Sequence, residues 1–238
     1  MSVVRINVVT IFPETMDVVL ATGMLAVAAK KGLVEFRTRS PREFTSDAHR
    51  TVDDSPFGGG AGMIMMAPPI VDAVESFKNA AGAIPGAPVL LMTPSGRRFD
   101  QAAAQRLAQE EELTFICGRY KGVDERVKEL IVTEEISLGD FVLSGGEFAA
   151  AAVIEAVVRL KAEVLGNEES ANSDSFATGR EGLLDAAWYT RPAEYRGLKV
   201  PDVLMSGHHA EIEKWRRQSS LERTRRHRPD LLDQKKRS

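Results

Sequence analysis

Two glycine-bearing segments decide the fold: LTFICGRYKG at residues 113–122 and SLGDFVLSGGE at residues 137–147. Leu113–Gly118 is a short apolar run that ends in a turn signal, so it predicts a buried strand. The second segment leads into an alanine-rich stretch from about Glu147 to Leu160, which predicts a helix. A strand, a polar loop and a helix in succession are typical of an α/β sheet.

The same alternation continues in both directions along the chain. Further strands are expected at Val3–Phe12, Val34–Thr38, Pro88–Thr93 and Ile131–Ile136. Helices are expected at Glu14–Lys31, Pro69–Ala81, Val123–Leu130 and, with Asp100 as its N-cap, up to about Glu111. The sequence therefore predicts a largely parallel α/β sheet.

The pattern changes after the alanine-rich helix. Residues 165–178 read LGNEESANSDSFAT, a polar stretch typical of a linker. Turns follow, and then a terminal helix that begins near Ser206. We therefore expect a sheet domain at residues 1–164, a linker at 165–178 and a small, mainly helical domain at 179–238.

Composition limits the possible classes of protein. The 238 residues are 43% hydrophobic and 27% charged, as in ordinary globular proteins. Cys117 is the single cysteine, so an internal disulfide is excluded, and no Cys/His spacing suggests a metal site. The richest apolar run, Phe148–Ile154, is too short to cross a bilayer. We expect a cytoplasmic protein without a membrane segment or signal peptide.

The net charge of −3 conceals an uneven distribution. Residues 214–238 hold ten lysines and arginines against three acids, a net charge of +7, which leaves −10 on the rest of the chain. A basic tail on an acidic body favours contact with a polyanion. A solvated terminal helix would show the same pattern.

Three glycine-bearing segments suggest a ligand site: Thr93–Gly96, Cys117–Gly122 and Ser137–Glu147. Ligands of open α/β sheets bind beyond the carboxyl ends of the strands, and these loops would offer many main-chain groups to a molecule such as adenosine. The alternative is three unrelated turns. The run Gly58–Gly62 matches neither a dinucleotide fingerprint nor a phosphate loop, and an ordinary mobile loop is favoured over a lid.

Several polar residues have an ordinary and a functional interpretation. Asp174 could be a turn residue or helix cap, and Arg159 could be solvated or paired with Glu155. The pair His208 and His209 is too small a ligand set to predict metal binding. The favoured interpretation is that the two histidines face phosphate. They would do so beside three further residues of the same segment: Trp215, Arg216 and Arg217.

Taken together, these segments resemble bacterial tRNA (guanine-N1-)-methyltransferases of the SPOUT superfamily. The matching pieces occur in order along nearly the whole chain: TIFPE (10–14), HRTVDDSPFGGGAGM (49–63), CGRYKGVDERV (117–127), SLGDFVLSGGE (137–147), DSF (174–176), YTRP (189–192) and VPDVLMSGHHAEIEKWRR (200–217).

The resemblance implies a sheet with a deep trefoil knot, a homodimer with its active site at the subunit interface, and S-adenosylmethionine as methyl donor. It places the cofactor, mostly through backbone contacts, on the following residues: Thr93, Pro94, Gly118, Leu138, Gly139, Asp140, Phe141, Val142, Leu143, Gly145 and Gly146. Family members have been regarded as magnesium-dependent, so Mg²⁺ stays open as an additional cofactor, but no ligand cluster in the sequence indicates a metal site.

The resemblance also implies the chemistry. The substrate would be the guanosine at position 37, immediately 3′ of the anticodon, bound through the anticodon stem-loop of tRNA. Asp174 would be the general base that removes the N1 proton. Arg159 is our candidate for stabilising charge on O6, and Asp174 would act on cofactor held by the other subunit.

The chain departs from the family pattern at three positions. Lys121 stands where the family usually has Glu, Phe141 replaces a frequent Tyr, and Ala149 replaces a common Pro. Other functions stay open: methylation of ribose 2′-OH or of another base, non-catalytic RNA binding, and nucleotide hydrolysis. The absence of a phosphate-loop lysine argues against the last of these.

Overall fold

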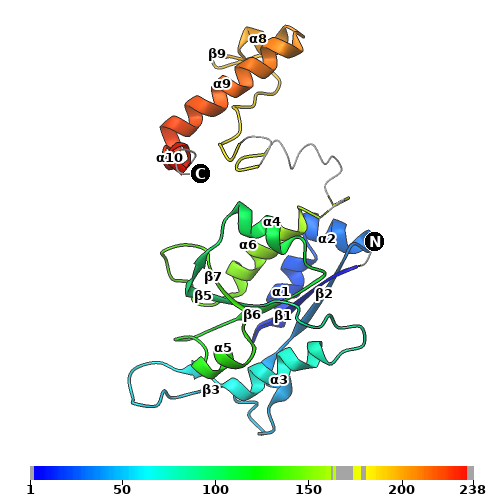
Figure 1. Cartoon of the computed structure of the whole chain (residues 1–238), viewed down its shortest axis with the longest axis vertical. Coiled ribbons are helices and arrows are strands. Elements are labelled where there is room, and N and C mark those ends of the chain that lie inside the picture. The colour runs from blue at the N-terminus through cyan, green and yellow to red at the C-terminus, as the bar shows by residue number, and fades with distance from the viewer. Residues whose placement is uncertain (1–2, 162, 165–173, 178–180, 235–238) are drawn as a thin grey trace. The chain divides into compact units, whose positions relative to one another are not determined.

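The computed structural model describes residues 3–161, 163, 164, 174–177 and 181–234. Its main sheet has five parallel strands in the order β2-β1-β6-β5-β7 (Figure 1). The strands are β1 (Val4–Val9), β2 (Val34–Arg39), β5 (Val89–Arg98), β6 (Glu112–Cys117) and β7 (Glu134–Ser137). The α/β class and the parallel sheet expected from the sequence are confirmed.

Helices cover both faces of this sheet. On one face α6 (Glu147–Val158) packs against α1 (Pro13–Leu20), α2 (Gly23–Lys30) and α4 (Gln101–Leu107). On the other face α3 (Ala67–Lys78) packs against α5 (Glu125–Ile131) and the 3-10 helix η1 (Pro41–Phe44). A two-stranded sheet of β3 (Asp53–Asp54) and β4 (Ile64–Met65) interrupts the long irregular segment before α3.

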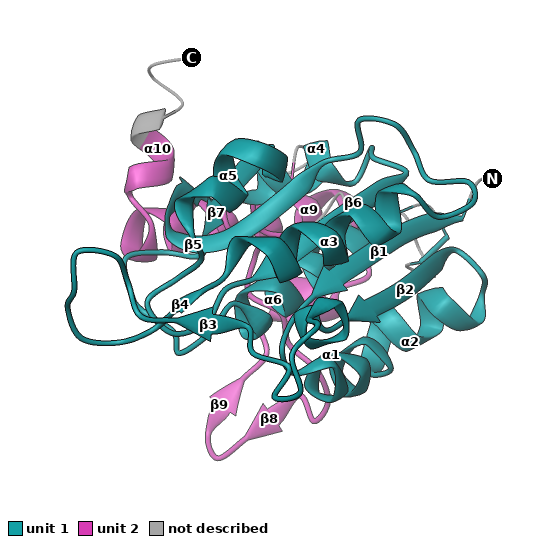
Figure 2. Cartoon of the chain, turned by 90° about the horizontal axis from the view of Figure 1, so that it is seen from below, with its two compact units in different colours: residues 1–166 teal, residues 167–238 magenta. Residues whose placement is uncertain are grey.

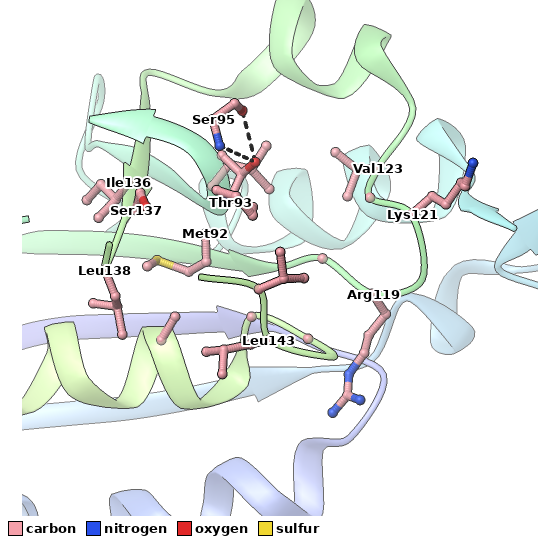
Figure 3. Close-up of a pocket in the computed structure, with 18 of the residues that line it drawn as sticks. Met92, Thr93, Ser95, Arg119, Lys121, Val123, Ile136, Ser137, Leu138 and Leu143 are labelled. Atoms are coloured by element: carbon pink, nitrogen blue, oxygen red, sulfur yellow. Dashed lines mark hydrogen bonds between the residues drawn. The ribbon is translucent and has the colours of Figure 1, made fainter. Parts of the chain in front are cut away.

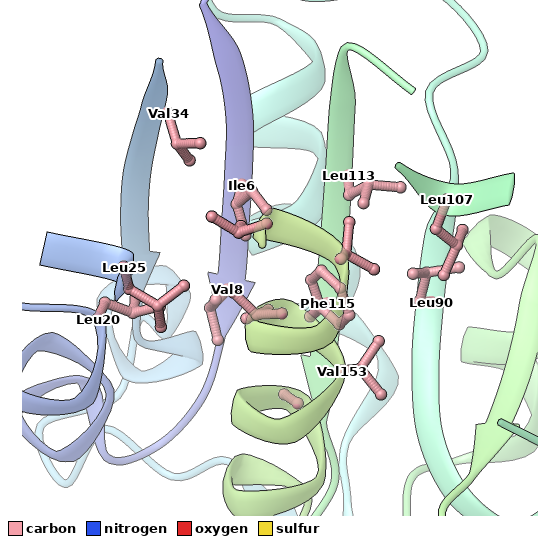
Figure 4. Close-up of a cluster of buried hydrophobic side chains, with 14 of the residues drawn as sticks. Ile6, Val8, Leu20, Leu25, Val34, Leu90, Leu107, Leu113, Phe115 and Val153 are labelled. Carbon is pink, nitrogen blue, oxygen red and sulfur yellow. The ribbon is translucent and has the colours of Figure 1, made fainter. Parts of the chain in front are cut away.

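Each face of the sheet has its own hydrophobic core, because successive side chains of a strand point to opposite faces. Ile6, Val8 and Phe115 belong to the core beneath α6, as Figure 4 shows. Val9 and Ile116 belong to the core beneath α3. The central strands are therefore apolar on both faces, as is typical of a covered parallel sheet.

The contacts divide the chain into two units, Met1–Gly166 and Asn167–Ser238, which Figure 2 distinguishes by colour. The second unit contains a hairpin of β8 (Glu194–Tyr195) and β9 (Leu198–Lys199), the short helix α8 (Asp202–Met205), the long helix α9 (His209–His227) and α10 (Asp230–Gln234). Of the predicted linker, residues 165–173 and 178 lie outside the described residues. The domain bounds stay a prediction.

Three local predictions were wrong. The expected helix Glu14–Lys31 is broken at Thr22, whose hydroxyl bonds to the carbonyl of Val18, and it restarts at Gly23 with a positive φ of 59°. The segment Thr93–Gly96, expected to follow a strand that ends at Thr93, lies within β5, whose pairing with β7 shifts between Met92 and Arg97. The terminal helix begins at His209, after a separate short helix.

Among the described residues, no helix combines the length and the apolarity needed to cross a membrane. Cys117 is fully buried, and burial raises the pKa of its thiol well above the usual value, with the charge of Glu147 acting in the same direction.

Candidate active site

A cavity of about 330 Å³ lies beyond the carboxyl ends of β5, β6 and β7. Three loops enclose it: residues 93–95 within β5, residues 118–125 after β6, and residues 137–146 between β7 and α6 (Figure 3). This is the edge of the sheet at which ligands of open α/β folds bind. The sequence left open whether the three glycine-bearing segments meet or are unrelated turns. In the structure all three line the same cavity.

The loop after β7 returns to the middle of the sheet through Gly146. Its N–H donates to the carbonyl of Gly118, at 2.9 Å. A Cβ on Gly146 would lie 2.8 Å from Cα of Cys117 and 3.1 Å from Cβ of Met92. Only glycine allows this approach, so the wall of the cavity depends on this residue.

Arg119 and Glu147 tie two of the loops together. The Nε of Arg119 donates to Oε2 of Glu147 at 3.0 Å, and Glu147 is only 1% exposed. The hydroxyl of Thr10 donates to Oε1 at 2.7 Å, and the guanidinium of Arg119 lies 4.5 Å from the centre of the Phe12 ring. The buried carboxylate thus has charged and neutral donors, as a buried ion pair requires.

A second polar network borders the opposite wall of the cavity. Ser95 Oγ donates to Glu135 at 2.9 Å and lies 3.0 Å from Oγ1 of Thr93. Lys128 pairs with Glu135 and Glu125, both at 3.2 Å. Desolvation favours a lower pKa for Lys128, but the hydrogen bonds to Glu125 and Glu135 outweigh it, and the pKa is raised. The ammonium therefore stays charged at neutral pH.

Most of the residues predicted to hold the cofactor line this cavity. Those that do are Thr93, Pro94, Gly118, Leu138, Gly139, Phe141, Val142, Leu143, Gly145 and Gly146. Asp140 does not, because its side chain points to solvent and pairs with Arg98 at 3.0 Å. Ser95, which lies within the selected segment Thr93–Gly96, lines the cavity as well, and so does Ile136, which the sequence analysis did not select.

Lys121 borders the cavity on the side away from Leu138 (Figure 3). Its N–H donates to the carbonyl of Met63, and a Cβ on Gly62 would lie 3.0 Å from its Cγ. The stem of Lys121 therefore covers the end of the glycine-rich run, so this end of Gly58–Gly62 is attached to the cavity loop.

Comparison with known proteins assigns the chain to a family. The chain matches the family model of tRNA (Guanine-1)-methyltransferase TrmD over residues 4–234. It belongs to the tRNA (guanine-1)-methyltransferase family. A relative named tRNA (guanine-N(1)-)-methyltransferase from Bacillus pumilus is 52% identical over 229 residues, which cover 96% of this chain and 92% of the relative. Relatives of the same name from Geotalea uraniireducens and Bacillus subtilis are 52% and 50% identical over 228 residues, 96% of this chain and 90% and 92% of theirs.

In this family member Asp174 belongs to the second unit. It begins a turn in which the N–H of Ala177 donates to its carbonyl at 3.2 Å. Ser175 Oγ accepts the N–H of Asp185 at 2.9 Å, and Phe176 N–H donates to the carbonyl of Leu183 at 2.8 Å. The carboxylate thus sits on a short segment that is tied to residues 183–185.

Three buried hydroxyls of α9 hold that neighbouring segment in turn. Thr224 Oγ1 accepts the N–H of Leu184 at 3.1 Å, and Ser220 Oγ donates to the carbonyl of Leu184 at 2.5 Å. Ser219 Oγ accepts the N–H of Ala187 at 3.0 Å. We call residues 184–187 with Ser219, Ser220 and Thr224 the hydroxyl strap. It connects the segment that carries Asp174 to the long basic helix.

Arg159 follows the last residue of α6, while Gly146 at the other end of this helix borders the cavity. The helix has twelve residues and is therefore about 18 Å long. Arg159 does not line the cavity.

The predicted tRNA-binding residues lie at the start and middle of α9. His208, His209 and Arg217 are exposed. Trp215 is half-buried and packs edge-on against Tyr189, with ring centres 6.2 Å apart. Arg216 stacks on Trp188. The last two therefore have packing roles inside the unit, and binding of tRNA by all five stays a prediction.

The described residues contain no group of three or more His, Cys, Asp or Glu side chains arranged to hold a metal ion.

Proposed function

We propose that this chain transfers the methyl group of S-adenosylmethionine to N1 of the guanosine at position 37 of tRNA. The observation that carries the proposal is the family match over residues 4–234. The cavity formed by the three glycine-bearing loops of the chain supports it. The family assignment supports the reaction class and the tRNA substrate. The methyl donor, the position and the residue roles are our inference.

The cavity fits the donor in size and chemistry. Its volume lies at the lower end of the range for small-molecule sites. Leu138, Ile136 and Leu143 offer an apolar surface to an adenine ring, and the loops around Gly118 and Gly145 present main-chain polar groups to its edge. Bound there, the donor would supply a methyl group already activated by a sulfonium.

The residues of the chain would make N1 of the acceptor base nucleophilic. N1 of guanine carries a proton at neutral pH, so a base must remove it for N1 to act as nucleophile. We assign this role to the carboxylate of Asp174, with the proton accepted on a carboxylate oxygen. Loss of the N1 proton places negative charge on O6, which the guanidinium of Arg159 would stabilise.

The site would be completed across a homodimer. Arg159 lies at the far end of α6 from the cavity of its own protomer, so it would serve the cavity of a second copy. Three large apolar side chains that line the cavity are exposed: Tyr120, Phe141 and Val142. Exposed apolar side chains that gather at one place are typical of a protein interface.

The second unit would bind the anticodon stem-loop. Its helix α9 ends in Arg225, Arg226 and His227, and residues 214–238 carry a net charge of +7. Phosphate contacts by these cations would make the affinity for tRNA fall with salt. The exposed His208, His209 and Arg217 would add contacts, in keeping with their place on the same helix.

Two further features complete the proposal. Residues 138–146 run from β7, at the edge of the sheet, back to β6, where Gly146 packs on Cys117 and Met92. This return past the loops after β5 and β6 supports a trefoil knot.

We also propose a cytoplasmic location, because an enzyme that modifies tRNA works where tRNA is used.

The test is position-specific methylation of a tRNA transcript that contains guanosine at position 37. The wild-type chain with S-adenosylmethionine should methylate N1 of that base alone, as read by mass spectrometry of nuclease fragments. Asp174→Asn should lower kcat by about 10²–10⁴-fold with the donor affinity unchanged. Methylation at ribose or at another position, or full activity of Asp174→Asn, would contradict the proposal.

A further inference from the structure

Trp188 combines high exposure with a fixed position. It is 60% exposed, although a tryptophan gains more free energy from burial than most side chains. Two contacts hold its ring. The guanidinium of Arg216 lies 4.6 Å from the ring centre, and Nε1–H donates to Oδ2 of Asp185 at 2.5 Å.

Both residues that hold the ring are themselves fixed. Arg216 pairs with Glu213 one turn earlier on α9, at 2.6 Å. Oδ1 of Asp185 accepts the N–H of Ala186 at 2.7 Å. The ring is thus supported over one face and at its edge while most of its surface faces solvent. An immobilised, exposed aromatic ring pays little entropy when a flat ligand stacks on it.

The surroundings of the ring specify the ligand. Trp188 is supported by the helix that carries the excess of positive charge, so a polyanion is the complementary partner. A flat aromatic group on a polyanion is a nucleobase, and bases of single-stranded RNA bind by stacking on aromatic side chains. A paired helix offers no free base face to such a ring.

We propose that Trp188 is a stacking platform for an unpaired base of the tRNA anticodon loop, distinct from the guanosine that is methylated. The inference rests on the proposed tRNA substrate. Asp185, which holds the edge of the ring, also donates its N–H to Ser175, beside Asp174. A base stacked on Trp188 would therefore fix the RNA relative to the segment that carries the proposed general base.

Fluorescence tests the platform without any need for methyl transfer. The chain has two tryptophans, so Trp215→Phe leaves Trp188 as the single reporter; because Trp215 is itself a predicted tRNA contact, the titration is carried to saturation with each RNA. Titration with an anticodon stem-loop RNA should quench its emission, whereas a fully paired RNA with the same number of phosphates should not. Equal quenching by both RNAs would overturn the proposal.

Binding measurements supply the second arm. Trp188→Leu should weaken binding of the stem-loop about 5- to 150-fold, whereas Trp188→Phe should stay within a few-fold of wild type. The salt dependence should not change, because no phosphate contact is removed. Tyr195→Leu is the matched control, since this ring is also exposed with an arginine 5.3 Å away, but lies on the β8–β9 hairpin. Tyr195→Leu should bind the stem-loop with an affinity within about two-fold of that of the wild-type chain.

The alternatives give distinct results. If Trp188→Leu binds the stem-loop as wild type does, the platform does not exist, and the proposed methyl transfer is unaffected. If Trp188→Leu instead dissociates the homodimer in analytical ultracentrifugation, the ring belongs to a protein interface and the proposal is overturned. If the wild-type chain fails to bind the stem-loop, both this inference and the proposed function are wrong.

Discussion

Arg119 and Glu147 join two loops of the cavity through one ion pair, with 3.0 Å between Nε and Oε2. Glu147 is almost fully buried, and its carboxylate bonds to this partner and to the hydroxyl of Thr10. The shape of the cavity is therefore linked to the stability of the sheet domain.

Replacing Arg119 by Met should destabilise the fold by about 3 kcal/mol, since it leaves a buried carboxylate without its cation. Urea unfolding would measure this change, and calorimetry should show weaker binding of S-adenosylmethionine. The control is Arg98→Met, which removes an exposed pair with Asp140 and should cost less than about 1 kcal/mol. Equal losses for the two variants would show that the buried pair has no special role.

Adding a single methyl group at Gly146 should disturb the cavity. The new Cβ would approach Cα of Cys117 and Cβ of Met92 so closely that backbone has to move. We expect Gly146→Ala to lose about 1–3 kcal/mol in urea unfolding. For Gly118→Ala the nearest atom is Cγ1 of Val123 at 3.4 Å, an ordinary contact, and less than about 1 kcal/mol is expected. A larger loss of unfolding free energy in Gly118→Ala than in Gly146→Ala would contradict this packing.

The hydroxyl strap should be sensitive to Thr224. Thr224→Val keeps the shape of the side chain but leaves the N–H of Leu184 without its acceptor, at a cost of about 1–3 kcal/mol. Hydrogen exchange at Leu184 should become faster, and Thr224→Ser should restore protection. Unchanged exchange in Thr224→Val would mean that the strap does not form in solution.

Acid should abolish the contribution of Asp124 to the free energy of unfolding. This residue caps α5 by accepting the N–H of Arg126, and the hydrogen bond from the Arg126 side chain lowers the pKa of its carboxyl. Because the folded pKa lies below the unfolded value near 3.8, the stabilisation is complete above that pH and is lost as the pH falls through the folded pKa. Asp124→Ala should cost about 1 kcal/mol at pH 6, and the difference from wild type should shrink below pH 3.8 in urea unfolding. A difference independent of pH would refute this cause.

The sequence predicted the sheet well because its signals are local. Short apolar runs such as Leu113–Cys117 can only be covered strands in this context, and the cap formed by Asp100 was visible in the order of residues. The break at Thr22 was missed, since one side-chain hydrogen bond and one positive φ decide it.

The site was harder to predict, because it depends on contacts between distant residues. Motifs found the loops of the cavity, but they could not show that Asp140 turns outward to Arg98. They also could not show that Arg216, whose contact with phosphate stays a prediction, stacks on Trp188, a residue that the sequence analysis did not select. An exposed tryptophan has no periodic signal that could distinguish it from a core residue.

Complementation between two inactive variants tests the central claim, that one subunit supplies the cavity and the other the carboxylate. Asp174→Ala has an intact cavity but lacks the base, and Thr93→Trp should fill the cavity while keeping Asp174. Each homodimer should be inactive, whereas the two chains co-expressed and mixed at random should recover about a quarter of wild-type methylation, since half the dimers would contain one complete site. No recovery from a mixture that forms mixed dimers would contradict the account.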